Sequence, residues 1–369
     1  MHDVSPIRIV VLCDWLPPDF GAVGQYAMGF ARDLAASGRR VTLVGLTSSD
    51  PGDQTVALGE GTLTVKRVHR PSYDRSAWLR RAWWTFGANL ALIRAAWRDL
   101  RASDEIRFTG SPPYMLHFVM PVAVLLGKRT RYRITDFHPE CLIAAIGRAP
   151  PWLRAIRAVT NFWRRRVDVI EVLGEDQRRR IVESRVATER IELVRDPSPV
   201  RFQAGVCATA KPAALSGRSI ILYSGNWGVA HDVETFLDGF GLYCARYPYA
   251  AGVWLNATGT RADAVERSLS MRRLPHARSR PVELAALPGV LAAADVHLIT
   301  LCDGFVGYVL PSKVYACVES GRPVLFVGSS ESDVHLVCSE RIPPRRYRRV
   351  DVGKPADVMH ALTELLAVE

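Results

Sequence analysis

Several features are missing from this 369-residue sequence, and each absence excludes a class of protein. No run approaches the roughly 20 uninterrupted apolar residues of a membrane-spanning helix. The N-terminus lacks a basic leader, an apolar segment and a small-residue cleavage site, so we expect no signal peptide. The seven cysteines are scattered, mostly in apolar runs, which is typical of reduced core residues in a cytoplasmic protein. No Cys or His spacing suggests a zinc site, and no nucleic-acid-binding module is recognisable.

Lysine is also scarce, because only five of the 48 basic residues are lysines and the rest are arginines. The distribution of these arginines is more informative than the net charge of +11. Residues 148–166 hold six arginines, two tryptophans and no acid, and residues 75–101 hold six arginines and four tryptophans. Such helical segments suit an anionic membrane surface, where indole rings lie at headgroup level. The alternative is a solvated basic face with the indole rings in the core.

The chain alternates short β-branched runs with longer amphipathic ones, which predicts α/β architecture with parallel sheets. One series opens with a strand at 7–13 and a helix at 24–38, and a second series starts with a strand at 219–225. The other strands expected in the first series lie at 39–45, 62–68, 105–109, 131–135 and 167–173. Residues 195–218, rich in proline and small residues, are typical of a linker. We therefore expect two doubly wound, Rossmann-like domains, 1–200 and 201–369, that face an interdomain cleft.

Two loops of the first series contain candidate site residues. In "DWLPPDFGAVGQYA", Gly21 and Gly24 open a helix and would let a substrate approach the backbone, although a plain glycine turn would look the same. In "ITDFHPECLIAAIG", the residues Asp136, His138 and Glu140 crowd one strand-to-helix turn. They are candidates for a general acid or base, or for helix caps.

Two stretches of the second series suggest an anion site. In "YSGNWGVAHD", the backbone N–H groups of the Gly225–Gly228 turn could cradle a phosphate, and His231 could add charge or a hydrogen bond. In "LPSKVYACVESG", Lys313 lies where a helix should begin, which is unfavourable for a cation unless an anion docks there. The alternatives are a structural turn and a surface lysine that bends toward solvent. Gly321 is the expected C-cap of this helix.

Taken together, these stretches resemble the retaining glycosyltransferases of family 4, which have the GT-B fold of two facing Rossmann-like domains. More narrowly, they are similar to the bacterial branch that builds surface polysaccharides and O-antigen. The resembling stretches, in chain order, are "LPPDFGAVGQYA", "GSPPYML", "TDFHPECLIAAIG", "IELVRDPSPVRF", "YSGNWGVAHDVETFLDGF", "LPGVLAAADVHLITL" and "VLPSKVYACVESGRPVLFVG". Together they cover much of the chain and indicate the fold and superfamily rather than the sugar.

The resemblance implies roles for particular residues. Asp136, His138 and Glu140 match the family turn that faces the transferred sugar or the acceptor, and Lys313 matches the cation near the leaving diphosphate, with all four expected in catalysis. Gly21 and Gly24 would belong to the acceptor-side loop. The residues expected to bind the donor are Arg195, Gly225, Asn226, Gly228, His231, Ser312 and Lys313.

The sequence departs from the family pattern at several positions. Tyr308 and Ala316 stand where many members have two glutamates, and Glu319 is one turn away from the second of them. Asn226 takes the place of a usual arginine, His231 lies near the position of a usual lysine, and Arg195 is expected to compensate. These departures keep a weakly catalytic nucleotide-sugar-binding subunit open as an alternative.

The resemblance thus implies a metal-independent hexosyltransferase that retains anomeric configuration and needs no cofactor besides its nucleotide-sugar co-substrate. We expect the donor on the C-terminal domain and the acceptor on the N-terminal domain. A polyprenyl-diphosphate-linked glycan is the expected acceptor, at the inner face of the plasma membrane, with a cytoplasmic, peripheral enzyme and no nucleic-acid partner. A soluble acceptor is the alternative. An epimerase is disfavoured, because no second set of cleft carboxylates is evident beyond Asp136 and Glu140.

Overall fold

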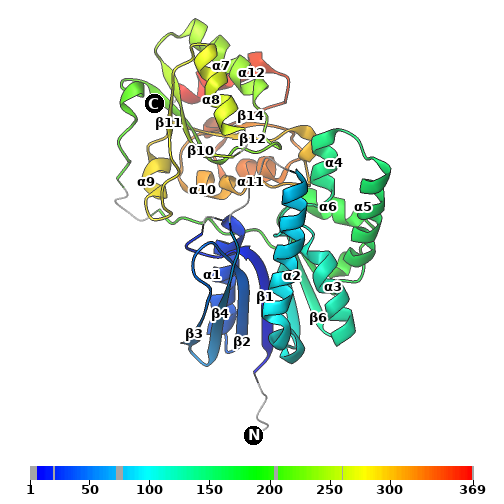
Figure 1. Cartoon of the computed structure of the whole chain (residues 1–369). Helices are drawn as coiled ribbons and strands as arrows, with labels where there is room; N and C mark the ends of the chain where they lie inside the picture. Colours follow the sequence, from blue (N-terminus) through cyan, green and yellow to red (C-terminus); the bar gives the residue numbers. More distant parts are fainter. Residues whose placement is uncertain (1–5, 20, 72–77, 203–206, 260, 368–369) are drawn as a thin grey trace. The chain divides into compact units, whose positions relative to one another are not determined.

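The computed structural model of the chain describes residues 6–19, 21–71, 78–202, 207–259 and 261–367 (Figure 1). The chain divides into two compact units, Met1–Arg195 (unit 1) and Asp196–Glu369 (unit 2), so the division lies five residues before the predicted one. Each unit is a mostly parallel sheet with helices on both faces, and the predicted α/β, doubly wound class is confirmed. Residues 75–77 of the basic segment and 203–206 of the linker lie outside the described residues.

Unit 1 contains an eight-stranded sheet in the order β3-β4-β2-β1-β5-β6-β7-β8. Its strands are β1 (Arg8–Trp15), β2 (Arg40–Thr47), β3 (Gly52–Leu58), β4 (Gly61–His69), β5 (Glu105–Thr109), β6 (Arg129–Ile134), β7 (Val169–Val172) and β8 (Ile191–Leu193). Its α-helices are α1 (Ala22–Ala36), α2 (Trp78–Ala102), α3 (Met115–Leu126), α4 (Glu140–Ile146), α5 (Pro151–Arg164) and α6 (Glu175–Glu183). Only β3 pairs antiparallel among the described strands of this sheet.

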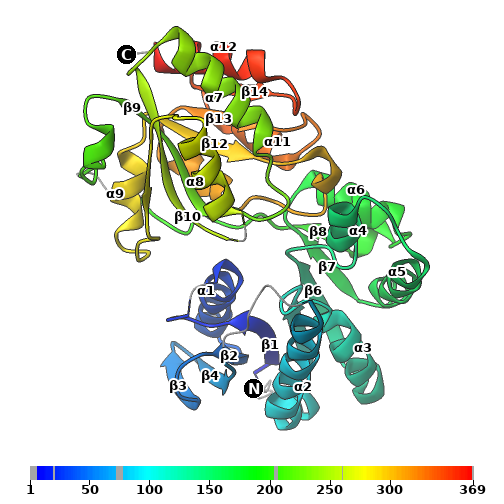
Figure 2. The same ribbon diagram turned by 45° about the horizontal axis from the view of Figure 1, so that its top comes forward.

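The two faces of the unit 1 sheet follow from the period-2 alternation of side chains along its strands. Ile9, Val11 and Cys13 of β1 pack in one apolar cluster with the inner face of α1. Helices α2 and α3 lie side by side (Figures 1 and 2), and α2 packs on β1, β2 and β4 while α3 packs on β5 and β6. Helices therefore cover the central strands β1, β5 and β6 of the sheet.

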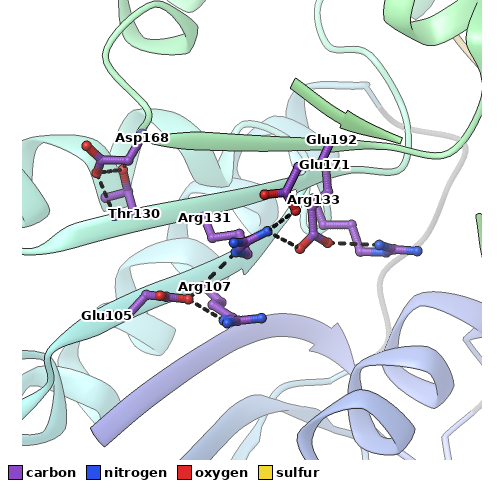
Figure 3. Close-up of polar contacts among 8 residues, drawn as sticks. All are labelled: Glu105, Arg107, Thr130, Arg131, Arg133, Asp168, Glu171 and Glu192. Atoms are coloured by element: carbon purple, nitrogen blue, oxygen red, sulfur yellow. Dashed lines mark hydrogen bonds and ion pairs between the residues drawn. The ribbon is translucent and has the colours of Figure 1, made fainter. Parts of the chain in front are cut away.

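One face of β5–β8 carries charges in place of apolar side chains (Figure 3). The participants are Glu105 and Arg107 on β5, Arg131 and Arg133 on β6, Glu171 on β7 and Glu192 on β8. Glu171 joins the network, because its carboxylate oxygens lie 3.0 Å from Arg131 Nη1 and 2.8 Å from Arg133 Nη1. The register places Arg107 opposite Arg131 and Glu171 opposite Glu192. The ion pairs between unlike charges offset these like-charge pairs.

Unit 2 contains a six-stranded, parallel sheet in the order β11-β10-β9-β12-β13-β14. Its strands are β9 (Ser219–Asn226), β10 (Ala251–Thr258), β11 (His276–Ser279), β12 (Val296–Thr300), β13 (Val324–Val327) and β14 (Tyr347–Val350). Its α-helices are α7 (Glu234–Arg246), α8 (Ala262–Met271), α9 (Leu287–Ala292), α10 (Lys313–Glu319), α11 (Asp333–Arg341) and α12 (Pro355–Leu366). Helices α7 and α12 lie side by side in both views (Figures 1 and 2).

The core of unit 2 has two layers, one on each face of its sheet. Ile221 and Tyr223 of β9 pack with α7, α8 and α12, whereas Ile220 and Leu222 face the cluster that contains α9 and Ala316 of α10. Helix α10 ends just before Gly321, whose φ of +67° is typical of the predicted C-cap glycine. The start of α10 lies close to the carboxyl end of β9, because its first residue, Lys313, neighbours Gly225.

Candidate functional site

The glycine turn that begins in the last residues of β9 is held by an aromatic stack. Gly225 has a φ of +124°, which favours glycine, and the ring of the fully buried Trp227 stacks on Tyr223 with 3.7 Å between centroids. The amide of Trp227 already donates to the Thr258 carbonyl over 2.7 Å. The N–H group of Trp227 is therefore not available to bind a phosphate in the predicted turn.

Lys313, the first residue of α10, directs its ammonium group into the protein. Nζ lies 3.2 Å from the centroid of the Tyr223 ring, a cation–π contact. A Cβ built on Gly225 would lie 3.6 Å from Lys313 Cε, so the two residues of the predicted anion site are neighbours. The alternative of a lysine that bends toward solvent is wrong, because Nζ is buried.

The electrostatics of Lys313 are those of a cation without a counterion. In the described part of the chain, Nζ has no hydrogen-bond partner. Burial lowers the pKa of Lys313 to about 7, since a charge removed from water favours its neutral form. An ammonium group in this position becomes favourable when an anion reaches it.

His231 lies in the same turn and contributes hydrogen bonding rather than charge. Its Nδ1 lies 2.6 Å from the carbonyl oxygen of Thr300 at the end of β12, so the ring proton is on Nδ1 and Nε2 is left as an acceptor. Burial, followed by the positive charge of Lys313, lowers the pKa of His231 to about 3. The imidazole is therefore neutral at physiological pH.

The other predicted donor-binding residues differ in their exposure and in the unit to which they belong. Asn226 is exposed, and Gly228 lies beside it, since a Cβ on Gly228 would be 3.4 Å from Asn226 Nδ2. Ser312 is the N-cap of α10, and its side chain makes no capping hydrogen bond. Arg195 is the last residue of unit 1, so it belongs to the other unit.

The family's second glutamate position is occupied by part of the core. Ala316 on α10 is buried in the same apolar cluster as Leu222 and Trp254, and a carboxylate there would be enclosed by apolar side chains. Tyr308, at the first position, is half-buried just before α10. Unit 2 therefore lacks a carboxylate at either position.

Glu140 in unit 1 forms a buried ion pair. Its two carboxylate oxygens lie 2.6 Å and 3.1 Å from the guanidinium nitrogens of Arg164, which is fully buried in α5 and lies over the Phe137 ring. Burial acts to raise the pKa of Glu140, but the charge of Arg164 outweighs it and the net shift is downward. The pair holds the turn after β6 against α5, and both glutamate oxygens are engaged in it.

Asp136 and His138 are the remaining titratable groups of that turn. Neither caps α4, because Pro139 is its N-cap and no side chain makes a capping hydrogen bond. Burial, followed by the charge of Arg81, lowers the pKa of His138 to about 4, so its ring is neutral. Asp136 is exposed as a residue, yet protein around its carboxyl group raises its pKa to about 6, which leaves it mostly ionised at pH 7.

Gly24 has a packing role at the start of α1. A Cβ on Gly24 would lie 1.8 Å from the carbonyl oxygen of Trp15, so only glycine lets α1 approach the end of β1 this closely. Gly21, the N-cap of α1, has ordinary extended backbone and ordinary spacing to Trp15. The predicted acceptor-side role of both glycines stays a prediction.

Sequence reasoning missed the aromatic residues that surround the lysine and the partner of Glu140. Tyr223 lies two residues before the predicted Gly225–Gly228 turn and Trp227 lies within it, so two aromatics at a strand end were the available signal. Arg164 lies 24 residues from Glu140 in the chain, so no local pattern connects them.

Two proteins named as glycosyltransferases are similar in sequence to part of this chain. No protein-family model matches the chain. WcaI of Escherichia coli, named as a glycosyl transferase of colanic acid biosynthesis, is 23% identical over 227 residues, covering 59% of this chain and 55% of that protein. WbjE of Pseudomonas aeruginosa, named as a glycosyltransferase, is 23% identical over 255 residues, covering 64% of this chain and 60% of that protein. The chain thus aligns with little more than half the length of these relatives.

Solved structures match over nearly the whole chain. The UDP-forming α,α-trehalose-phosphate synthase of Burkholderia vietnamiensis has a TM-score of 0.67 at 13% identity, with 98% of this chain and 92% of that chain covered. HepE of Anabaena, solved in complex with UDP and glucose, has a TM-score of 0.61 at 10% identity, with 97% and 90% covered. At these identities the likeness shows the fold, which is GT-B.

Proposed function

We propose that this protein is a glycosyltransferase that moves a sugar from a nucleotide-sugar donor to a glycan acceptor. The observation that carries the proposal is the buried ammonium group of Lys313, which lies beside Gly225 and has no hydrogen-bond partner among the described residues. A diphosphate supplies the missing anion. The names of WcaI and WbjE, and the UDP bound to HepE, support a nucleotide-sugar reaction.

The chemistry of sugar transfer explains why such a cation is useful. When the glycosidic C–O bond of the donor breaks, negative charge grows on the departing diphosphate, and a preorganised cation in a desolvated site stabilises it. The Tyr223 ring under the ammonium holds Lys313 in place before the donor arrives. His231 offers Nε2 as an acceptor for a donor hydroxyl, because Nδ1 is committed to Thr300.

The resemblance to family 4 leads us to propose the finer features of the reaction. Transfer retains the anomeric configuration, moves a hexose and uses neither a metal nor another cofactor. Asp136 and His138 lie on the acceptor side, and Glu140 positions their turn through Arg164. Asp136 is the ionised group of the three that is free of that ion pair.

The acceptor that we propose is a lipid-linked glycan, because the helical layer of unit 1 has an amphipathic outer surface. Its exposed aromatic and apolar side chains include Trp83, Phe86, Leu90 and Trp97 on α2 and Trp152 and Phe162 on α5. On α2 the successive positions are three, four and seven residues apart, so the four side chains share one face of the helix. Arg94 and Arg101 lie on the same face. Trp83 is 74% exposed and Trp152 is 53% exposed, which argues against the alternative that places these rings in the core.

An anionic bilayer complements this surface, because arginines bind lipid phosphates while indole rings enter the headgroup region. We therefore propose peripheral binding at the cytoplasmic face of the membrane. Among the residues that the structure describes, no helix has the length and apolarity needed to cross a bilayer.

Vesicle flotation tests the membrane proposal. The protein should float with vesicles that contain phosphatidylglycerol, float less with purely zwitterionic vesicles, and detach as salt rises. Trp83→Ser should weaken the binding several-fold, because it removes a large interfacial side chain. Tyr249→Ser is the matched control, since Tyr249 is 76% exposed but lies in unit 2. Equal flotation with both vesicle types, or equal effects of the two variants, would refute this part of the proposal.

A donor panel tests the reaction itself. We expect one of a set of UDP-, GDP- and dTDP-sugars to raise the melting temperature and to be turned over with release of its nucleoside diphosphate. Stabilisation should be measurable, because a ligand at 100 times its Kd adds about 2.7 kcal/mol to the folded state. Lys313→Ala should lower kcat/KM by about 2–4 kcal/mol of transition-state stabilisation. Unchanged turnover in that variant would remove Lys313 from the mechanism.

A second candidate is a nucleotide-sugar-binding subunit with little catalysis of its own. It is favoured by one specific observation, namely that Ala316 is buried in the core where the family resemblance calls for a glutamate. The same donor panel separates the two functions, since a binding subunit would be stabilised by the nucleotide sugar without releasing the diphosphate.

A further inference from the structure

Asp14 lies in a bulge where β1 ends. The pairing of β1 with β2 shifts register between Leu12 and Trp15, and Asp14 falls within that shift. Bulges occur beside active sites, where they re-aim a side chain. Ser111 follows the neighbouring strand β5, and its side chain is near enough to lower the pKa of the Asp14 carboxyl group, against the larger effect of burial.

Two oxygen atoms near this bulge have unused hydrogen-bonding capacity. Asp14 Oδ1 and Thr135 Oγ1 are both buried, and in the part of the chain that the structure describes neither has a hydrogen-bond partner. Buried polar atoms are normally paired, so each unpaired one needs an explanation. A ligand that brings hydroxyl groups would satisfy both atoms.

A second carboxyl group, that of Asp136, lies within electrostatic range of Asp14. Burial is the main cause that raises the pKa of Asp14 to about 6, and the negative charge of the nearby Asp136 adds to it. Gly110 lets the two loops approach, because a Cβ there would lie 3.1 Å from Thr135 Oγ1 and 3.3 Å from the Asp136 carbonyl oxygen. Asp14 lies at the end of β1, Ser111 follows β5 and Asp136 follows β6, so the three residues lie at the carboxyl ends of three consecutive strands, where open α/β sheets bind ligands.

We infer that Asp14, Ser111 and Asp136 bind adjacent hydroxyl groups of a saccharide. This inference rests on the proposed function, and it names the part of the acceptor that unit 1 holds. Carboxylates accept hydrogen bonds from O–H groups, and the Ser111 and Thr135 hydroxyls can both donate and accept. A divalent cation prefers carboxylate, carbonyl and water oxygens, so a site in which two of the four side chains are hydroxyls suits a polyol better.

Saturation-transfer NMR on the full chain, with a panel of methyl hexopyranosides as probes, tests the inference. At least one glycoside should bind the wild-type protein, and Asp14→Asn should weaken that binding about ten-fold or more, because a hydrogen bond to a charged group is lost. Asp50→Asn is the matched control, since Asp50 is exposed on the same unit. The affinity for UDP should be the same in all three proteins, which also shows that Asp14→Asn has folded.

Gly110→Ala provides a second variant that leaves both carboxyl groups intact. Its methyl group must displace Thr135 or the Asp136 backbone, so glycoside binding should weaken while UDP binding persists. The inference is overturned if no glycoside binds the wild type, if Asp14→Asn binds glycosides as the wild type does, or if Asp14→Asn abolishes binding of Mn²⁺ while the glycosides stay inert. Failure of the proposed function has a different signature, namely no binding or turnover of any nucleotide sugar by the wild type.

Discussion

The affinity of this protein for a nucleoside diphosphate should fall as the pH rises above 7, and Lys313 should be the cause. Burial lowers the pKa of Lys313 to about 7, so the empty site loses its positive charge in a range where the nucleotide remains anionic. A bound diphosphate would restore a high pKa by accepting charge-assisted hydrogen bonds from the ammonium. Above pH 7, binding is therefore coupled to the uptake of one proton.

The size of the effect follows from the pKa alone. About half of the empty protein carries the charge at pH 7, and about 1% carries it at pH 9, so Kd should rise about 50-fold between these pH values. The affinity falls as the pH rises because the pKa of Lys313 is depressed in the empty protein. The lysine must therefore take up a proton before the anion binds. Affinity should be greatest below pH 7 and should then fall, by a factor that approaches about ten per pH unit above pH 8.

Isothermal titration with UDP at pH 7, 8 and 9 measures this slope, and buffers of different ionisation enthalpy count the proton directly. Lys313→Arg is the matched control, because guanidinium stays charged throughout this range. Its Kd should be independent of pH, and Lys313→Met should bind weakly at every pH. A wild-type Kd that does not change between pH 7 and 9, or a slope that persists in Lys313→Arg, would refute the reasoning.

Two further substitutions test the framework of each unit. Glu140→Gln leaves the fully buried Arg164 without its anion, so the free energy of unfolding should fall by about 3–5 kcal/mol. Chemical denaturation measures this change, with Glu60→Gln at an exposed position as the control. Equal effects of the two substitutions would contradict a buried ion pair. Gly225→Ala forces an L side chain to a φ of +124° with its methyl 3.6 Å from Lys313 Cε, so stability should fall by about 1–3 kcal/mol. Its affinity for UDP should fall as well, and an affinity equal to that of the wild type in titration calorimetry would exclude the turn from the site.

Much of the fold could be predicted, because local patterns decide it. The strands expected at 105–109 and 219–225 are β5 and β9 to within one residue, since β-branched runs bounded by polar residues leave little ambiguity. Gly321 ends α10 as expected, because a positive φ at that position favours glycine. The edge strand β3 was missed, because its side chains are exposed and lack the apolar alternation that reveals a strand.

The site was harder to predict, because its decisive contacts join distant segments. The local sequence shows that Lys313 is unusual at a helix start. It does not show that the side chain is buried, because the ring under it belongs to Tyr223, 90 residues earlier in the chain. Glu140 looked like a catalytic candidate, and only the position of α5 reveals that Arg164 engages both of its oxygens. Asp14 gave no sequence signal, because a strand bulge depends on how β1 pairs with β2.

The central claim is that Lys313 and the turn at Gly225 hold the diphosphate of a sugar donor. A crystal structure of the protein with UDP tests this most directly. The account predicts a phosphate oxygen within about 3 Å of Lys313 Nζ, the distance of a charge-assisted hydrogen bond, with the diphosphate seated against Gly225. A diphosphate bound elsewhere on the chain, with Lys313 Nζ still resting on Tyr223 and touching no phosphate, would contradict it.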